Sequence, residues 1–445
     1  IRRPPRSTLS SSSAASDVYK RQKMNIKLCT ETFNQENPAS LKTYLAQGGY
    51  EAWKKIIHNN IPKSDVIAKI KNSGLRGKGG AGFLTGLKWS FIPLSKEDKY
   101  LVCNSDESEP GTCKDRDILR YNPHSVIEGM LIACYAIGAS VGYNYLRGEF
   151  INEQWKVFNE ALTEAYKMKF IGNNIFSSNI SIDIHALIGA GAYIVGEETA
   201  MLESIEGKRG MPRIKPPFPA IKGLFGKPTI INNTETLSSV PKIMLNTDDW
   251  YKNIGIDESD GIKMFSMSGH LETPGNFEIP LGTPFADLLK LAGGVWKNRK
   301  LKAVIPGGSS VPVVKGDIMM DVKMDYESIA SVGSMLGSGG VIVMDESTCM
   351  VSVLHRISRF YYAESCGQCT PCREGTGWLY RILSNIIEGR GTSKDLAQLD
   401  RIASQIEGHC ICALGDAAAM PVRSFLKNFW QEFEYYVDNK RSMVS

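Results

Sequence analysis

Apolar residues in the first half of the chain form short continuous runs that alternate with stretches of helical spacing. The run 100–103 is apolar and ends in a polar turn, which is typical of a buried strand, whereas the apolar positions of 123–138 recur as on a helix. The same patterns predict amphipathic helices over 40–59, 64–72 and 152–168, and strands near 141–146 and 181–185. Strands that alternate with helices favour an α/β domain with a largely parallel sheet.

The pattern changes twice in the second half. Residues 212–228 are rich in Pro and Gly and are predicted to form an ordered crossing without a helix. Strand, strand, helix and strand are then predicted over 263–269, 274–280, 284–291 and 303–308. This order fits a small β-grasp (ubiquitin-like) domain, and the later segment 348–439 has helical periodicity throughout. We therefore predict a multidomain α/β protein with an α/β domain at 24–250, a β-grasp domain at 251–337 and a helical domain at 338–445.

Charge is balanced over most of the chain. Six of the 52 basic residues, but only one of the 47 acidic residues, fall within positions 1–23. The remainder carries no net basic footprint, so binding to nucleic acid or to an anionic membrane is not supported. Positions 1–23 are predicted to be a disordered tail or an artefact ahead of a start at Met24, with a transit peptide as the alternative. No uncharged apolar run reaches the ~18–20 residues of a membrane span.

Cysteine spacing carries the strongest chemical signal. Cys366, Cys369 and Cys372 follow a C-x2-C-x2-C pattern, and Cys412 lies further along the chain. Three ligands from one loop and one remote ligand are typical of a [4Fe–4S] cluster, which carries single electrons. Structural zinc more often uses two separated pairs, whereas Cys410 and Cys412 are only one residue apart. The pattern favours the cluster, with a zinc site and inert thiols as alternatives.

A glycine-rich segment precedes the first predicted strand. Gly77, Gly79 and Gly82 spell G-x-G-x-x-G, but they follow the predicted helix 64–72, whereas a Rossmann fingerprint follows a strand. Closely spaced glycines still let backbone N–H groups approach a phosphate or a planar ring. Positive charge is supplied nearby by Arg76, Lys78 and Lys88. The segment predicts a site for a phosphate-bearing cofactor, and a flexible surface loop is the alternative.

Polar groups also gather where predicted strands end. Asp106, Glu107 and Glu109 follow Asn104 at the carboxyl end of the strand 100–103, the edge at which open α/β sheets bind ligands. They can accept hydrogen bonds from a ribose or a flavin, bind a hard cation, or form a solvated turn. The pair Glu197-Glu198 and the run Asn232-Asn233-Thr234-Glu235-Thr236 allow two interpretations, a cofactor pocket or ordinary helix starts.

Taken together, these segments resemble the NADH-oxidising flavoprotein subunit of respiratory complex I, NADH:quinone oxidoreductase. The resemblance extends from about Ser40 to about Val437. It rests on Gly77-Lys-Gly-Gly-Ala-Gly-Phe-Leu-Thr-Gly-Leu-Lys-Trp89, Asn104-Ser-Asp-Glu-Ser-Glu-Pro-Gly-Thr112, Gly196-Glu-Glu-Thr199, Ile231-Asn-Asn-Thr-Glu-Thr236, Ser365-Cys-Gly-Gln-Cys-Thr-Pro-Cys-Arg-Glu-Gly375 and Ile411-Cys-Ala-Leu-Gly-Asp416. It implies a Rossmann-like FMN domain of unusual topology, a β-grasp domain, and a C-terminal helical bundle that carries one [4Fe–4S] cluster.

The resemblance also implies roles for individual residues. Contacts to FMN are expected from Gly77, Lys78, Gly79, Lys88, Asn104, Asp106, Tyr193, Gly196, Glu197, Asn232, Asn233 and Thr236. Contacts to NADH are expected from Gly80, Phe83, Phe91, Glu107, Glu109, Glu198, Lys215 and Phe218, with the aromatic rings stacked on the adenine. Among these, Glu107, Glu109 and Glu198 are the candidate catalytic residues, which orient the dinucleotide without acting as an obligatory acid or base. The cluster ligands are expected to be Cys366, Cys369, Cys372 and Cys412.

The function implied is oxidation of NADH by hydride transfer to FMN, followed by transfer of single electrons through the cluster and ultimately to quinone. Partners would be other peripheral-arm subunits, notably the [2Fe–2S] thioredoxin-like subunit and the large iron–sulfur subunit. The expected location is the cytoplasmic side of a bacterial inner membrane, or the matrix side of the mitochondrial one. Alternatives are an NAD-linked diaphorase subunit of a hydrogenase or formate dehydrogenase, and a zinc-stapled interaction module.

The chain departs from the family pattern at three positions. Lys78 stands where the family usually has Arg, and it keeps the charge while losing the bidentate fork. Leu84 stands where Pro is usual, and Cys410 where Thr is usual. Because Cys410 is close in sequence to the expected ligand Cys412, it is a candidate for ligand exchange in mutants.

Overall fold

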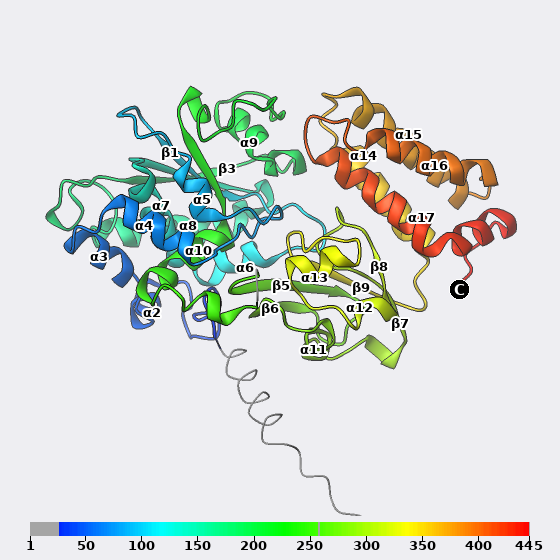
Figure 1. Cartoon of the computed structure of the whole chain (residues 1–445), viewed down its shortest axis with the longest axis horizontal. Coiled ribbons are helices and arrows are strands. Elements are labelled where there is room, and N and C mark those ends of the chain that lie inside the picture. The colour runs from blue at the N-terminus through cyan, green and yellow to red at the C-terminus, as the bar shows by residue number, and fades with distance from the viewer. Residues whose placement is uncertain (1–25, 257–258, 445) are drawn as a thin grey trace, which may run out of the picture.

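Two β-sheets and a group of C-terminal helices make up the protein (Figure 1). The computed structural model describes residues 26–256 and 259–444. The predicted tail at 1–23 lies outside these residues. The predicted multidomain α/β architecture with a parallel sheet is confirmed.

The first sheet has four parallel strands in the order β3-β2-β1-β4. Its strands are β1 (Tyr100–Ser105), β2 (Val141–Leu146), β3 (Asp183–Ile188) and β4 (Thr229–Asn233). Strands β2 and β3 lie on one side of β1, and β4 pairs with its other side. Successive strands are therefore added on one side of β1 as far as β3, and the next strand, β4, is added on the other side. Ligands bind outside the carboxyl ends of strands where the strand order reverses in this way, here between β1 and β4.

Helices cover this sheet and fix the positions of its strand ends. The helices of this part are α2 (Leu41–Ala46), α3 (Glu51–His58), α4 (Lys63–Asn72), α5 (Thr85–Ser90), α6 (Lys114–Tyr121), α7 (Pro123–Ile137), α8 (Gln154–Lys167), α9 (Glu198–Ile205) and α10 (Thr234–Leu245). Helix α7 is buried along almost its whole length because α4, α8 and α10 pack around it. The predicted helix 40–59 is two helices, since Gly48 and Tyr50 adopt positive φ between them.

The second sheet has five strands in the order β6-β5-β9-β7-β8. Its elements are β5 (Ile262–Gly269), β6 (Gly275–Pro280), α11 (Phe285–Leu291), β7 (Leu301–Ile305), β8 (Val314–Lys315), α12 (Gly316–Met319), α13 (Tyr326–Ser331) and β9 (Gly340–Asp345). Strand β9 is central, because it pairs in parallel with β5 and antiparallel with β7. The sheet thus extends beyond the domain boundary predicted at 337. The glycines at 337, 339 and 340 mark the entry into a strand of this sheet.

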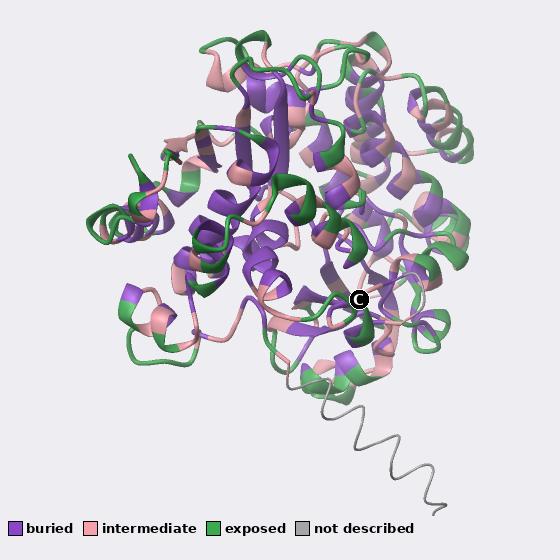
Figure 2. Ribbon diagram, turned by 60° about the vertical axis from the view of Figure 1, so that its left-hand side comes forward, coloured by how far each residue is buried: buried purple, intermediate pink, exposed green. Residues whose placement is uncertain are grey.

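The C-terminal segment folds into α14 (Met350–Glu364), α15 (Thr370–Ile387), α16 (Ser393–Ile406) and α17 (Leu414–Asn439), which pack on one another. One apolar core joins residues of these helices to Val102 of β1 and Ile305 of β7. The buried positions in Figure 2 accordingly run from the first sheet into the helices. None of the described helices is long and apolar enough to cross a membrane.

Candidate functional site

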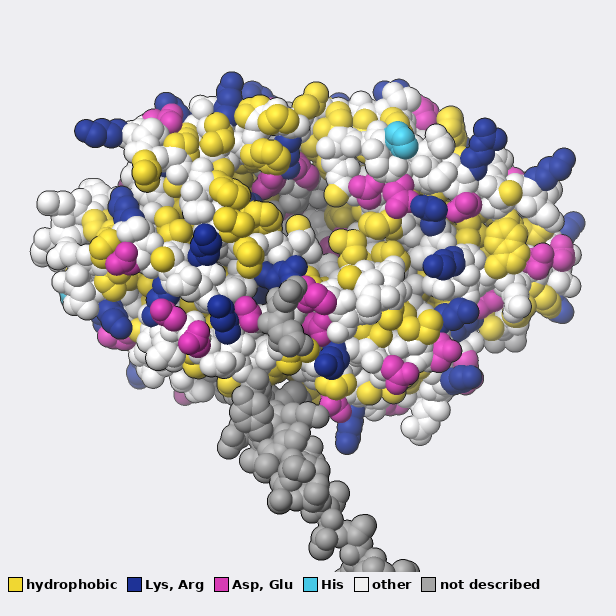
Figure 3. All heavy atoms as spheres, viewed as in Figure 1, with side chains coloured by type: hydrophobic (Ala, Val, Ile, Leu, Met, Phe, Trp, Pro, Cys, Tyr) yellow, Lys and Arg dark blue, Asp and Glu magenta, His cyan; other side chains and the backbone are white. Residues whose placement is uncertain are grey.

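A cavity of about 800 Å³ opens at the carboxyl ends of β1 and β4. This volume is within the range of small-molecule and cofactor sites. Among the residues expected to bind cofactors, its lining includes Gly79, Gly80, Asn104, Asp106, Glu107, Glu109, Tyr193, Gly196, Glu197, Asn233 and the predicted cluster ligand Cys412. Figure 3 shows a hollow with acidic side chains near the centre of the molecule's face.

The glycine segment forms one wall of this cavity. Gly79 packs so closely on β4 that an added Cβ atom would lie 3.1 Å from the Cβ of Asn233. Gly80 has φ +144°, and an added Cβ there would meet no atom within 4 Å. The segment connects α4 to α5 with no strand before it, in agreement with the rejection of a Rossmann fingerprint. Its backbone is exposed to the cavity, as the binding of a phosphate or a flat ring requires.

Asp106 carries a free acceptor atom into the cavity. Its Oδ1 accepts a hydrogen bond from Ser108 Oγ at 3.2 Å, whereas its buried Oδ2 has no hydrogen-bond partner among the described residues. Burial raises the pKa of this carboxyl group to about 7. Asn104 supports the turn, since its side chain accepts from the Asp106 N–H and donates to the Gly196 carbonyl oxygen. A buried acceptor without a partner fits a ligand that donates an N–H or O–H group at this point.

The two glutamates of the same turn already have partners. Both carboxylate oxygens of Glu107 accept backbone N–H groups at the start of α6, from Asp115 and Arg116, at 2.9 Å each. Glu109 accepts from Tyr193 Oη at 2.6 Å and from the backbone N–H of Ser310 at 2.8 Å. Burial, together with Asp115, raises the pKa of Glu107 to about 7, and burial also raises the pKa of Glu109. Glu109 thus joins the first sheet's domain to the loop after β7.

The raised pKa of Asp106 makes a testable difference to stability. The folded chain favours the protonated carboxyl group, so this stabilisation is complete below the ordinary pKa of 3.8 and is lost as pH rises through about 7. In the flavin-free chain we expect Asp106→Asn to gain stability relative to wild type between pH 4.5 and pH 8. Urea unfolding at the two pH values measures this difference, and an equal difference at both would contradict the assignment.

A second group of charges lies beside the cavity lining. Glu198 is 3.1 Å from Lys88 Nζ and 2.9 Å from Lys215 Nζ. Burial alone would raise the pKa of Glu198, but the two lysines lower it below its usual value. Glu197 caps α9 through the Thr199 and Ala200 N–H groups and also pairs with Lys215 at 3.0 Å. These ion pairs connect α5, α9 and the crossing 212–228.

The three aromatic residues expected to stack on adenine are half exposed. Phe83 and Phe91 lie on either side of α5 with their ring centroids 6.1 Å apart. Phe218 lies in the crossing 212–228, which was predicted to have no helix and contains one short 3-10 helix, Leu224–Gly226. These three residues, like Glu198 and Lys215, are not part of the cavity lining. The structure therefore places Gly80, Glu107 and Glu109 of the expected NADH contacts at the cavity, and the other five outside it.

Several residues expected to contact FMN support the wall from behind instead. Lys78 is buried, and its Nζ donates to Ser239 Oγ at 2.7 Å, while its backbone N–H donates to Thr236 Oγ1 at 2.9 Å. Asn232 Oδ1 accepts from Trp89 Nε1 at 2.8 Å. Asn233 accepts hydrogen bonds from the first N–H groups of α10, which confirms its interpretation as an N-cap. The same residue also lines the cavity. Gly77 and Lys88, like Lys78, Asn232 and Thr236, lie outside the lining.

The cysteine loop lies between α14 and α15, opposite the turn that joins α16 to α17. Cys369 immediately precedes α15, and Cys372 lies in its first turn. Cys372 neighbours Cys366 and Cys369, and Cys412 neighbours the same two residues. Burial and the neighbouring thiols raise the pKa of Cys372 to about 11, and burial, Glu197 and the neighbouring thiols raise that of Cys412 to about 12. Such thiols remain protonated at neutral pH unless a bound cation displaces the proton.

The number and kind of these thiols fit a cubane, in which each of four thiolates binds a different iron atom. Among residues 26–256 and 259–444, no group of three or more His, Cys, Asp or Glu side chains is arranged to hold a metal ion. Cys412 belongs both to this group and to the cavity lining, so the two sites share a wall.

Part of the cavity wall was not predicted from the sequence. Loops of the second sheet and the start of α17 supply Ser310, Val311, Met335, Gly337, Ser338, Leu414, Ala417 and Met420. Thr112, just before α6, and Lys114 and Asp115, at its start, line it as well. The glycine run at 337–340 was the available signal, since glycine permits close approach of the backbone to a ligand.

A parallel-sheet cavity that shares a wall with four clustered cysteines defines a redox protein, in which an organic cofactor site adjoins an iron–sulfur site. Comparison with known families agrees. Residues 70–242 match the Nuo51 FMN-binding domain, residues 264–314 the SLBB domain, and residues 352–436 the NADH-ubiquinone oxidoreductase-F iron-sulfur binding region.

Relatives with the same domains extend over nearly the whole chain. The chain is 51% identical over 404 residues to the F subunit of NADH-quinone oxidoreductase from Rickettsia bellii, and the match covers 90% of this chain and 96% of that protein. It is 48% identical over 404 residues to an F subunit of NADH-quinone oxidoreductase from Rhizobium meliloti, covering 90% and 95%. Among solved structures, a chain of the NAD+-reducing [NiFe]-hydrogenase in the H2-reduced state matches with a TM-score of 0.80 and 31% identity, covering 96% of this chain and 73% of that one.

The chain belongs to the family of NADH-quinone oxidoreductase F subunits. It is a flavoprotein subunit of an NADH dehydrogenase, and its cofactors are FMN and a [4Fe–4S] cluster, with NADH as substrate. The residues at the cavity fit this assignment, since the backbone at Gly80 suits a flavin phosphate or ring, and the free Oδ2 of Asp106 suits an N–H or O–H group of the cofactor. The clustered thiols suit the iron–sulfur group.

Proposed function

We propose that the cavity binds FMN and admits NADH, so that the chain oxidises NADH and delivers single electrons through its cluster to partner subunits and ultimately to quinone. FMN, when bound, supplies the chemistry that accepts a hydride and releases electrons one at a time. The observation that supports this function best is the double position of Cys412, which lines the cavity and neighbours Cys366 and Cys369. Electrons that leave the cavity therefore have a short path to the cluster.

Each part of the chain has a distinct role in this proposal. The backbone at Gly79 and Gly80 binds the flavin, and Asp106 accepts a hydrogen bond from it. Lys78, Asn232 and Thr236 do not line the cavity; they hold the glycine segment against β4 and α10. Glu107 holds α6 in place, and Glu109 clamps the cavity wall through Tyr193 and Ser310.

The ion-pair group beside the lining orients the dinucleotide. Glu198 offers a carboxylate between Lys88 and Lys215, and the half-exposed rings of Phe83, Phe91 and Phe218 offer faces for an adenine. None of these groups has to exchange a proton in a hydride transfer. We therefore assign Glu107, Glu109 and Glu198 to positioning the substrate.

The finer description of the fold and of the partners belongs to the same proposal. The second sheet with its helix α11 supports a β-grasp (ubiquitin-like) domain, and the mutual packing of α14 to α17 supports a helical bundle. The acceptors would be a [2Fe–2S] thioredoxin-like subunit and a large iron–sulfur subunit. The complex would lie on the cytoplasmic side of a bacterial inner membrane, or on the matrix side of the mitochondrial one.

The test is the visible absorption spectrum of the anaerobically purified chain before and after addition of NADH. Flavin bands and a broad iron–sulfur shoulder, bleached by NADH and not by NADPH, are expected. A colourless protein that contains zinc would contradict the proposal in favour of an interaction module. Absorption bands that do not change on addition of NADH would leave the cluster assignment in place but contradict NADH as the electron donor.

A diaphorase subunit of an NAD-linked hydrogenase is the second candidate, because the similar solved chain belongs to an NAD+-reducing [NiFe]-hydrogenase. The identities favour the first candidate, since this chain is 51% identical to the Rickettsia bellii relative but 31% identical to the hydrogenase chain. Purification of the chain with its natural partners separates the two. A quinone-reducing assembly is expected, and co-purification with a nickel-containing subunit would reverse the assignment.

Lys88→Ala tests the ion-pair group. We expect FMN retention to weaken by roughly tenfold, because removal of the lysine leaves Glu198 with less compensation beside an anionic cofactor. Fluorescence titration of released flavin measures the dissociation constant. Lys167→Ala removes the same charge from an exposed position on α8 and serves as the control. Equal retention in both variants would remove the role of Lys88.

A further inference from the structure

Acidic side chains dominate the lining of the cofactor cavity. Seven carboxylate side chains belong to it, those of Asp106, Glu107, Glu109, Asp115, Glu197, Glu407 and Asp416. Among the described residues of the lining, Lys114 is the only lysine or arginine. FMN carries a phosphate group, and a bound phosphate needs positive charge or backbone N–H groups beside it. Lys114 is therefore the one charged side chain of this wall that favours an anion.

The basic residues in and around the glycine segment do not supply this charge to the cavity. Arg76 pairs with Glu327 at 2.7 Å. Lys78 and Lys88 have the hydrogen-bond and ion-pair partners described above. None of these three basic residues belongs to the cavity lining. The wall takes its positive charge instead from the start of α6.

Lys114, the first residue of α6, is held by two buried carboxylates. Its Nζ donates to Asp115 Oδ1 at 2.8 Å and lies 2.9 Å from Glu235 Oε2. Burial alone would lower the pKa of Lys114, but Asp115 and Glu235 raise it above its usual value, so the side chain remains charged. Lys78 and Lys263 share Glu235 with Lys114. Three lysines thus face the two carboxylates that pair with them, and one positive charge remains.

Asp115 connects this charge to the glycine wall. Its Oδ2 accepts a hydrogen bond from Asn233 Nδ2 at 2.6 Å. Asn233 is the N-cap of α10 and packs against Gly79, where an added Cβ atom would lie 3.1 Å from the Asn233 Cβ. Lys114, the start of α10 and Gly79 therefore surround one corner of the cavity. The positive end of a helix dipole favours an anion at the same place.

We propose that Lys114 provides the positive charge that holds the phosphate group of FMN at this corner, against the glycine segment. The proposal rests on the proposed function and concerns a residue to which that function gives no role. Lys114 acts through its charge and by fixing Asp115 and Asn233 in place, because its ammonium group is buried and already paired. A buried charge is screened by salt much less than an exposed one. Lys114 is thus a positioning residue, and no proton or electron passes to it.

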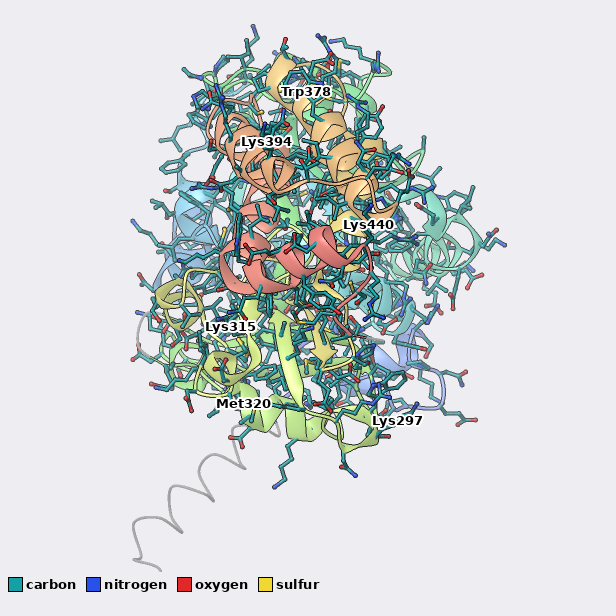
Figure 4. All side chains as sticks on the ribbon, turned by 90° about the vertical axis from the view of Figure 1, so that its right-hand side faces the viewer. Lys297, Lys315, Met320, Trp378, Lys394 and Lys440 are labelled. Carbon is teal, nitrogen blue, oxygen red and sulfur yellow. The ribbon has the colours of Figure 1, made fainter. Side chains whose placement is uncertain are left out.

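A second groove offers a matched control. It has a volume of about 780 Å³ and lies between α15 and α16, and its lining includes Trp378, Lys394 and Arg401. Figure 4 shows Trp378 and Lys394 on these neighbouring helices. Replacement of Lys394 by Gln removes one positive charge from an exposed position of this groove and leaves the lining of the cofactor cavity unchanged.

The test compares the dissociation constants of FMN and of riboflavin, which lacks the phosphate, for the full chain after release of its flavin. Fluorescence titration measures both constants. For Lys114→Met we expect the constant for FMN to rise by roughly tenfold and that for riboflavin to change by less than about twofold. Lys394→Gln should leave both constants at their wild-type values. Equal losses of FMN and riboflavin affinity in Lys114→Met, or an unchanged affinity for FMN, would overturn the proposal.

Asp115→Asn tests the same charge with the opposite sign. It removes a negative charge beside Lys114, so the ratio of the FMN constant to the riboflavin constant should fall, and an unchanged ratio would contradict the role of Lys114. Circular dichroism reports folding, and if Lys114→Met does not fold, the ratio in Asp115→Asn decides. A wild-type chain that binds neither flavin would instead contradict the proposed function, so the two failures are distinguishable.

Discussion

Replacement of Glu235 by Gln is expected to lower the free energy of unfolding by about 3–5 kcal/mol, the usual cost of breaking a buried charge pair. The Glu235 side chain is fully buried, and Lys114 Nζ is 2.9 Å from its Oε2. Lys78 and Lys263 lie at 3.5 and 3.6 Å, and both are buried. Burial alone would raise the pKa of Glu235, but the three lysines lower it to about 2. A neutral amide would leave these lysines without their shared counter-charge.

The effect should be cooperative because Glu235 joins separate parts of the chain. Its lysine partners come from the glycine segment, from α6 and from β5, and its Oε1 also accepts from the Met264 N–H at 2.8 Å. Burial and the two other lysines lower the pKa of Lys263 to about 8, so Lys263 is already the least favourably charged member. Glu235→Gln combined with Lys263→Met should therefore recover part of the loss.

Urea unfolding of the purified variants measures the change. Glu160→Gln is the matched control, since Glu160 is exposed on α8 and its replacement is expected to change stability by less than about 0.5 kcal/mol. Equal stability of the Glu235 and Glu160 variants would show that the buried lysines do not depend on this carboxylate.

Local patterns were sufficient to predict the sheet edge where the cavity lies. The run 100–103 and the polar residues after it predicted β1 and its carboxyl end, because strand ends and acidic turns are neighbours in sequence. The spacing of Cys366, Cys369 and Cys372 predicted their grouping for the same reason. The side-chain contacts of the individual cofactor-binding residues remain proposals.

Long-range packing determined what the sequence did not reveal. Lys78, beside closely spaced glycines, has the composition of a phosphate site, yet its side chain points to Ser239 and Glu235 because a buried carboxylate is available there. Strand β9 falls outside every strand that the sequence predicted, and only its pairing with β5 and β7 makes it central. The place of Cys412 in the cavity wall depends on how α17 packs against the first domain, which no local pattern encodes.

Cys372→Ser is expected to abolish the cluster signal while NADH oxidation with ferricyanide, which takes electrons from the flavin, persists in part. Cys372 is buried in the first turn of α15, beside Ser365 Oγ at 3.1 Å, and neighbours Cys366 and Cys369. Its loss removes one corner of the cubane from inside the group of thiols. The glycine segment and Asp106 belong to a different part of the chain and should continue to bind FMN.

Iron content, the electron paramagnetic resonance signal and the rate of ferricyanide reduction measure the two sites separately. Cys349→Ser is the matched control, because Cys349 is a partly buried thiol just before α14 and outside the cysteine loop. Loss of FMN together with the cluster would contradict the separation of the two sites. That result would mean that the start of α17, which contributes Cys412, Leu414 and Ala417 to the cavity wall, needs the bound cluster to hold its position. Retention of FMN with loss of the cluster would show that the cavity wall holds without the iron.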